Sequence, residues 1–198
     1  MSKIVAAYSP NVSKLISSLS NSQSMKIIYQ IIETSSICVE DIEPYRHFET
    51  SSYGRNLIYG CSQFEMILIC WKPEQESAIH DHDQSDCIMR CISGKLEETR
   101  YIQTSCEDGS ASEIKQVNSK IVREGDVTYI NNDIGLHKIR NINEGVSFAL
   151  HVYFPGIRKC HIFNTEDNSK REIMNSFTSE YGVKKNKAGM GYDEYWNN

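Results

Sequence analysis

The pattern of hydrophobic and polar positions divides the chain into a short helical part and a longer part rich in strands. Within residues 10–47, apolar side chains such as Leu15, Ile16 and Leu19 recur three and four positions apart, which is the spacing of one helix face. The four isoleucines between positions 27 and 32 predict a second helix with a single apolar stripe. The N-terminal quarter is therefore expected to form two helices.

From Phe64 onward, short runs of β-favouring residues alternate with turn residues. Residues 64–71 (FEMILICW) form a nearly continuous apolar run, which is typical of a strand buried on both faces. Further strands are predicted over residues 87–92, 96–103, 113–122, 126–130, 137–142, 147–154, 160–163 and 170–177. Many short strands at such spacing indicate an antiparallel sandwich or barrel.

Charge and composition exclude several classes of partner. The chain has 198 residues with 21 Lys+Arg against 26 Asp+Glu, and it contains no dense basic block, so neither nucleic acid nor an anionic membrane is expected as a partner. No apolar run approaches the roughly 20 residues of a membrane span. The N-terminal segment lacks the apolar core of a signal peptide, which predicts a cytoplasmic protein.

The cysteines do not form a recognisable framework. Their number is odd, no CxxC pair occurs, and their spacings do not match the common structural zinc motifs. Most are expected to be small buried side chains with reduced thiols. The seven positions are Cys38, Cys61, Cys70, Cys87, Cys91, Cys106 and Cys160.

His80-Asp81-His82 is the strongest local sign of chemistry. On a strand, residues i and i+2 share a face, so both imidazoles can reach one point while Asp81 points away. Two half-exposed histidines near a loop are the plain alternative. His137 follows a turn at the start of a predicted strand, and a compact barrel would bring it opposite the pair. Three neutral imidazoles suit Zn, Fe, Cu or Ni, and an open coordination side would make the site catalytic.

Two segments resemble the cupin motifs of the cysteine dioxygenase family. Residues 70–101 are similar to the first motif, in which a cysteine replaces the glutamate of most cupins, and Cys87 follows His82 with the family spacing. Residues 125–141 are similar to the second motif, with His137 at the ligand position.

Two shorter segments strengthen this resemblance. Tyr53-Gly54-Arg55-Asn56 is similar to the family's Tyr-x-Arg-Asn segment, and residues 150–153 are similar to its Leu-His-Leu-Tyr segment. Cys160 also falls on a family cysteine. The likeness extends over roughly residues 10–182, and four motifs in the family's order are far more specific than one HxH pair.

The resemblance implies a mainly β fold, a cupin-type antiparallel β-barrel (jelly roll) with a short N-terminal helical segment. We expect a single cupin domain over residues 1–198, with the helical segment in about 10–47, the barrel in about 57–182 and a tail over 183–198. Family members are usually monomers, so a monomer is expected.

The resemblance also implies one Fe(II) per chain, bound by His80, His82 and His137. The usual iron oxygenase triad contains a carboxylate, and its replacement by a neutral imidazole leaves the metal more positive, which suits a coordinating thiolate. The family reaction joins L-cysteine, held through its sulfur and amine, with O2 to give cysteine sulfinic acid, a step of cysteine catabolism.

Five further residues receive roles from the resemblance. Arg55 is expected to pair with the substrate carboxylate and Tyr53 to add a hydroxyl donor. Cys87 and Tyr153 are the positions of the family's thioether cross-link, and His151 is expected to hydrogen-bond the tyrosine hydroxyl. A solvated loop arginine and a structural cysteine beside a core tyrosine are the plain alternatives.

Three positions depart from the family pattern. Ala149 stands where animal members commonly have serine, Phe154-Pro155 replaces a Ser-Pro pair with a cis bond, and Glu74 replaces a glycine. None of these is a predicted ligand. The sequence leaves open whether the bond before Pro155 is cis.

Three other functions remain open. A thiol dioxygenase could act on 3-mercaptopropionate or cysteamine, although relatives using mercaptopropionate tend to lack an arginine at position 55. A non-catalytic metal-binding cupin would need no substrate arginine, and a cupin with another metal, such as an isomerase, would match only the HxH pair. His47 and His161 are assigned no role.

Overall fold

The N-terminal part of the chain is helical, as predicted. The structure is a computed structural model that describes residues 8–104 and 113–185. It contains α1 (Pro10–Ser20), α2 (Met25–Glu33) and the 3-10 helix η1 (Glu40–Tyr45). None of the helices in these described ranges is long and apolar enough to cross a membrane.

The buried stripe of α2 is narrower than the sequence predicted. Ile28 and Ile32 are buried, whereas Ile27 is 50% exposed and Ile31 only partly covered. Neighbouring residues on a helix point about 100° apart, so only the pair four positions apart faces the sheet below.

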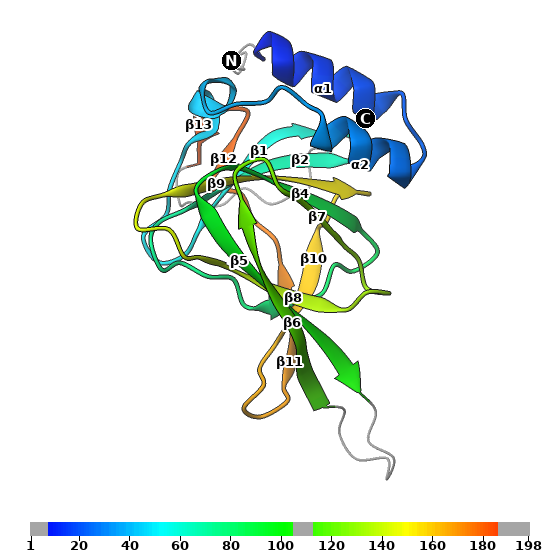
Figure 1. The fold of residues 1–198 in the computed structure, drawn as a ribbon, viewed down its shortest axis with the longest axis vertical. Helices are drawn as coiled ribbons and strands as arrows, with labels where there is room; N and C mark the ends of the chain where they lie inside the picture. Colours follow the sequence, from blue (N-terminus) through cyan, green and yellow to red (C-terminus); the bar gives the residue numbers. More distant parts are fainter. Residues whose placement is uncertain (1–7, 105–112, 186–198) are drawn as a thin grey trace.

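The remaining described chain consists of strands arranged in two sheets. One sheet has the order β13-β12-β1-β2-β9-β4-β7 and the other the order β11-β10-β3-β8-β5-β6 (Figure 1). The strands are β1 (Gly54–Gly60), β2 (Glu65–Trp71), β3 (Ile79–His80), β4 (Asp86–Ser93), β5 (Lys95–Thr104), β6 (Glu113–Arg123), β7 (Val127–Ile130), β8 (Leu136–Asn141), β9 (Ser147–Phe154), β10 (Lys159–Phe163), β11 (Lys170–Met174), β12 (Ser179–Glu180) and β13 (Val183–Lys184). The mainly β jelly-roll prediction is confirmed, with two sheets rather than one closed ring.

The edges of the first sheet differ from the sequence prediction. β1 begins at Gly54, before the expected barrel start, and β12 pairs with β1 in parallel, so the sheet is not wholly antiparallel. β13 occupies Val183 and Lys184, which the sequence assigned to the tail. Two-residue strands are too short to show a period, which explains why they were missed. The expected tail beyond residue 185 and Cys106 lie outside the described residues.

The first sheet is buried on both faces, because the helices cover one side and the second sheet covers the other (Figure 1). Along β2, Met66 and Leu68 pack toward the helices, whereas Ile67 and Ile69 pack toward the second sheet. Every residue of β2 is buried, which confirms the prediction from its continuous apolar run.

Gly94 connects β4 to β5 through a conformation that other residues avoid. Its φ is 91°, and a Cβ built there would lie 2.1 Å from Oγ of Ser147. Glycine is therefore required both by backbone conformation and by the close approach of β9. The turn positions β4 and β5 on opposite sheets, each of which contributes to the site described next.

Candidate active site

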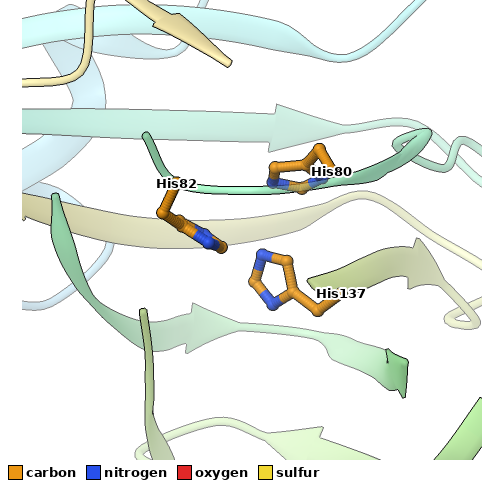
Figure 2. A group of neighbouring side chains, drawn as sticks. All are labelled: His80, His82 and His137. Carbon is orange, nitrogen blue, oxygen red and sulfur yellow. The ribbon is translucent and has the colours of Figure 1, made fainter. Parts of the chain in front are cut away.

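Three histidines converge between the sheets. His80 at the end of β3 pairs directly with His137 on β8, and His82 follows two residues later. One ligand atom from each lies within 4.8 Å of the others, and the three rings point toward a common centre (Figure 2). The ring centroids are 4.7 Å apart for both pairs that involve His137 and 5.2 Å apart for His80 and His82. This cluster can hold a metal ion.

Hydrogen bonds at Nδ1 orient two of the rings. His80 Nδ1 lies 2.9 Å from the carbonyl oxygen of Ala78, and His137 Nδ1 lies 3.0 Å from Oε1 of Glu98. Both partners are acceptors, so we assign the proton of each ring to Nδ1. The Nε2 lone pairs of these two histidines are then available to a metal.

His82 supplies an independent test of metal binding. Its side chain is fully buried, and among the described residues neither ring nitrogen has a hydrogen-bond partner. A buried polar atom without a partner is costly, and coordination of a metal would satisfy it. Burial lowers the pKa of His80 to about 3 and holds the pKa of His82 well below its ordinary value, so both rings are neutral donors. The donor set therefore fits a transition metal.

Asp81, between the two histidines, points away from them as predicted. Its carboxylate accepts hydrogen bonds from the backbone N–H and Nδ1 of His161, both at 2.8 Å. These bonds fasten the His80–His82 segment to β10. His161 had been given no role from the sequence, yet it helps to position two potential ligands.

Glu98 is a site residue that the sequence reasoning missed. Its carboxylate is fully buried on β5 and accepts from Thr128 Oγ1 at 2.7 Å, while Lys120 Nζ lies 3.1 Å away and Arg100 Nη2 3.3 Å away. Burial by itself would raise its pKa, but hydrogen bonds from His137 and Thr128 hold the pKa well below the ordinary value. An anionic carboxylate therefore supports His137. The sequence contained one sign of this role. Glu98 follows the core residue Leu96 by two positions on a strand, so its charged side chain lies on the same, buried face.

The inner face of the other sheet places Cys87, His151 and Tyr153 opposite the histidine cluster. Cys87 on β4 and Tyr153 on β9 are paired in register, and the ring centroids of Tyr153 and His82 are 6.4 Å apart. His151 Nδ1 lies 3.4 Å from the Tyr153 hydroxyl and 3.9 Å from Cys87 Sγ. Burial raises the pKa of both Cys87 and Tyr153, so thiol and phenol are neutral.

Arg55 projects from β1 toward the same interior. It pairs in register with Ile69, whose side chain faces the second sheet. Its neighbours fix the backbone, because a Cβ at Gly54 would lie 2.1 Å from the carbonyl oxygen of His47, and the buried Asn56 donates to that carbonyl at 2.9 Å. The backbone N–H of Arg55 donates to Thr178 Oγ1 at 3.1 Å. The arginine is thus held by a rigid segment.

Arg55 interacts with the hydroxyl groups of Tyr53 and Tyr153. Burial raises the pKa of Tyr53 and of Tyr153, and in each case a hydrogen bond and the positive charge of Arg55 oppose the shift. The Tyr53 ring packs on Trp71 with centroids 4.3 Å apart. A cation flanked by two phenol donors is suited to bind a small carboxylate.

The departures from the family pattern leave this geometry in place. Ala149 is fully buried on β9, and the Phe154–Pro155 bond is cis although phenylalanine replaces serine. Glu74 has a φ of 63°, in the left-handed region that favours the glycine expected there. The backbone around the site is therefore kept despite the changed side chains.

Fold and site together define the class of protein, a cupin-type jelly roll with a three-histidine cluster between its two sheets. The sequence model of the family "Cysteine dioxygenase type I" matches residues 11–166. The chain belongs to this family and is a thiol dioxygenase.

Curated relatives named cysteine dioxygenase type 1 are similar to this chain over most of its length. The protein of Bos taurus is 29% identical over 176 residues, which cover 81% of this chain and 86% of that protein. The protein of Homo sapiens is 28% identical and covers 84% and 90%, and that of Danio rerio is 27% identical and covers 80% and 86%. The similarity thus extends over most of each protein.

Proposed function

We propose that this protein is a cysteine dioxygenase that oxidises L-cysteine with O2 to cysteine sulfinic acid, with one Fe(II) bound by His80, His82 and His137. The observation that carries the proposal is the convergence of His80, His82 and His137 in the interior between the sheets, toward which Arg55 projects from β1 of the opposite sheet. The names of the curated relatives support it.

The overall change is balanced without a further reactant. The thiol sulfur gives up four electrons to O2, both oxygen atoms end on sulfur, and R–SH plus O2 becomes R–SO2H. Bound Fe(II) would supply the redox chemistry that lets O2 react with the thiol at neutral pH. The protein would supply the orientation of the two reactants, which converts a rare encounter into a reaction within one complex.

Arg55 and Tyr53 would bind the carboxylate of the substrate. A guanidinium presents parallel N–H donors that match a carboxylate, and the nearby phenol of Tyr53 adds a third donor. Trp71, 1% exposed, packs against the Tyr53 ring and would shield one side of this subsite from water. A buried charge pair is stronger than an exposed one because screening by solvent is lost.

Tyr153, His151 and Cys87 would act on the opposite side of the substrate. The Tyr153 hydroxyl stays protonated, since burial holds its pKa well above the ordinary value, and it can donate a hydrogen bond toward the reacting atoms. His151 Nδ1, 3.4 Å from that hydroxyl, would orient it. We also propose that Cys87 and Tyr153 become joined by a thioether bond during turnover. The new S–C bond replaces the thiol S–H bond and one ring C–H bond, and O2 takes up the two electrons and two protons that are released.

We further propose that the protein is a monomer with one cupin domain over residues 1–198, and that it works in the cytoplasm, where reduced cysteine is the abundant form. Other thiols remain the nearest competing substrates, and a metal-binding cupin without activity is the competing class of function.

The decisive experiment is anaerobic loading with Fe(II), followed by measurement of O2 uptake with L-cysteine, 3-mercaptopropionate and cysteamine. We expect L-cysteine to be the best substrate and its sulfinate to form in equal amount to the O2 consumed, as detected by mass spectrometry. Faster O2 uptake with 3-mercaptopropionate or cysteamine would show that this thiol, and not L-cysteine, is the preferred substrate. Iron binding without any thiol-dependent O2 uptake would favour a metal-binding cupin without activity.

A further inference from the structure

Asn132, in the loop between β7 and β8, hydrogen-bonds to the backbone of the segment that carries His82. Its Oδ1 accepts from the His82 N–H at 2.8 Å, and its Nδ2 donates to the carbonyl oxygen of Asp83 at 2.5 Å. Only one orientation of the amide group satisfies both partners, because one is a donor and the other an acceptor. The side chain of Asn132 therefore joins two segments that lie 50 positions apart in the sequence.

The segment that Asn132 holds has an unusual backbone. Asp83 has a φ of 50°, in the left-handed region that residues other than glycine seldom adopt. His82 lies beyond the end of β3, and its carbonyl oxygen accepts from the Ser85 N–H at 2.8 Å, which closes a turn. A residue persists in such a conformation when its surroundings fix it. The two bonds of Asn132 fix the backbone on both sides of the His82–Asp83 peptide bond.

The ring of His82 depends on its backbone more than the other two rings do. His80 and His137 are oriented by hydrogen bonds at Nδ1, whereas neither ring nitrogen of His82 has a hydrogen-bond partner among the described residues. The direction of the His82 ring is therefore set by its backbone and by packing. A shift of the turn would move this ring relative to the other two.

The loop that carries Asn132 is itself fixed at both ends. Asn131 Nδ2 donates to Oδ1 of Asp86, at the start of β4, at 3.0 Å. Gly135 ends the loop with a φ of 132°, and a Cβ built there would lie 2.4 Å from the carbonyl oxygen of Tyr101 on β5. Glycine alone allows this conformation and this close approach. Asn132 is therefore presented to the turn from an anchored loop.

We propose that Asn132 is a positioning residue for metal binding, because it holds the turn at which the His82 ring meets the rings of His80 and His137. This inference rests on the proposed function to the extent that a metal ion binds these three histidines. Without the two bonds of Asn132 the turn is free to move. A ligand that must first be ordered costs conformational entropy, so the metal binds more weakly.

The test is binding of Co(II) to the full chain in competition with a coloured chelator, without O2, together with the visible absorption of the cobalt complex. Asn132→Ala removes both hydrogen bonds, whereas Asn132→Asp keeps an oxygen acceptor for the His82 N–H. Asp133→Ala, at the exposed neighbouring position, is the matched control and also reports the effect of one charge in this loop. We expect Asn132→Ala to weaken Co(II) binding about tenfold and to change the cobalt absorption, with Asn132→Asp within about threefold of wild type and the control close to it.

A folded Asn132→Ala protein with the Co(II) affinity of the control would overturn the inference, and so would equal losses in the alanine and aspartate variants. If Asn132→Ala does not fold, Asn132→Ser, whose hydroxyl cannot reach both backbone groups, is judged by the same criteria. Absence of Co(II) binding in the wild type would overturn the inference together with the proposed metal site. Because no O2 is used, loss of the role of Asn132 is distinct from failure of the dioxygenase proposal, which wild-type O2 uptake tests.

Discussion

Cys87 and Tyr153 lie directly opposite each other on β4 and β9, and Nδ1 of His151 is within 3.9 Å of the sulfur and 3.4 Å of the hydroxyl. Side chains at directly opposed positions of antiparallel strands have Cβ atoms only about 4.5–5.5 Å apart. The sheet register therefore brings thiol and phenol together without any loop rearrangement. The three histidines come from the other sheet and Arg55 comes from β1, so all of these side chains lie in the interior between the two sheets.

The thioether bond proposed between these two side chains is open to a direct test. After turnover with Fe(II), O2 and L-cysteine, intact mass spectrometry should show a fraction of wild-type protein that has lost two hydrogens, and denaturing gels should show two bands. Cys87→Ser should abolish both signs. Cys91→Ser is the matched control, because Cys91 is buried on the same face four residues along β4 and faces Ala149 instead. A wild-type mass that stays unchanged after turnover would contradict the bond.

Removal of the Arg55 charge should weaken substrate binding. Loss of a buried partner for a carboxylate costs about 2–5 kcal/mol, so Arg55→Ala should raise the KM for L-cysteine sharply, with a smaller effect on kcat. Arg55→Lys should restore only part of the loss, since an ammonium cannot bind a carboxylate in the same bidentate way. Arg171→Ala, at an exposed position of β11, is the control. Unchanged kcat/KM in Arg55→Ala would remove this residue from the substrate site.

Glu98 should strengthen metal binding through His137. Replacement of a carboxylate that supports a ligand histidine typically costs 10–100-fold in metal affinity, so Glu98→Gln should weaken Fe(II) or Co(II) binding by about that factor. Competition with a coloured chelator measures this directly, without reference to activity. Glu97→Gln provides the control, because Glu97 is the neighbouring residue and accepts only from Ser119 Oγ, at 2.9 Å, among its described hydrogen bonds. Equal affinities in the two variants would show that Glu98 has no such role.

Glu65 should make the metal-free protein lose stability as the pH rises. Burial raises its pKa from 4.5 to about 7, so the folded state holds the proton more tightly than the unfolded state. The contribution is fully present below pH 4.5 and is lost progressively up to about pH 7. The free energy of unfolding of Glu65→Gln minus that of wild type should therefore grow by on the order of 3 kcal/mol between pH 4 and pH 8.

Urea unfolding at several pH values measures this difference, with Glu113→Gln as the reference for an exposed carboxylate. A Glu65→Gln difference that is constant over this range would mean that Glu65 titrates normally in the folded protein.

The local patterns predicted most elements but not their edges. The run at 64–71 was identified as a doubly buried strand because burial on both faces leaves no polar alternation, and β2 is buried throughout. The same run contains the buried Glu65, whose carboxylate accepts a hydrogen bond from the backbone N–H of Ile157, 92 positions away. Ile27 was placed on the buried stripe by spacing, and its exposure follows from the position of the sheet under α2.

By itself, the sequence determined the classes of element and the HxH pair, because these depend on residue type and short spacing. The motif positions of Arg55, Cys87, His137 and Tyr153 came from its resemblance to a known family. Only the tertiary structure decided which distant side chains share the interior. Glu98 reaches His137 because β5 and β8 are neighbours in one sheet, and Asp81 meets His161 because β3 lies beside β10. Such pairings follow from strand order, and no local period encodes strand order.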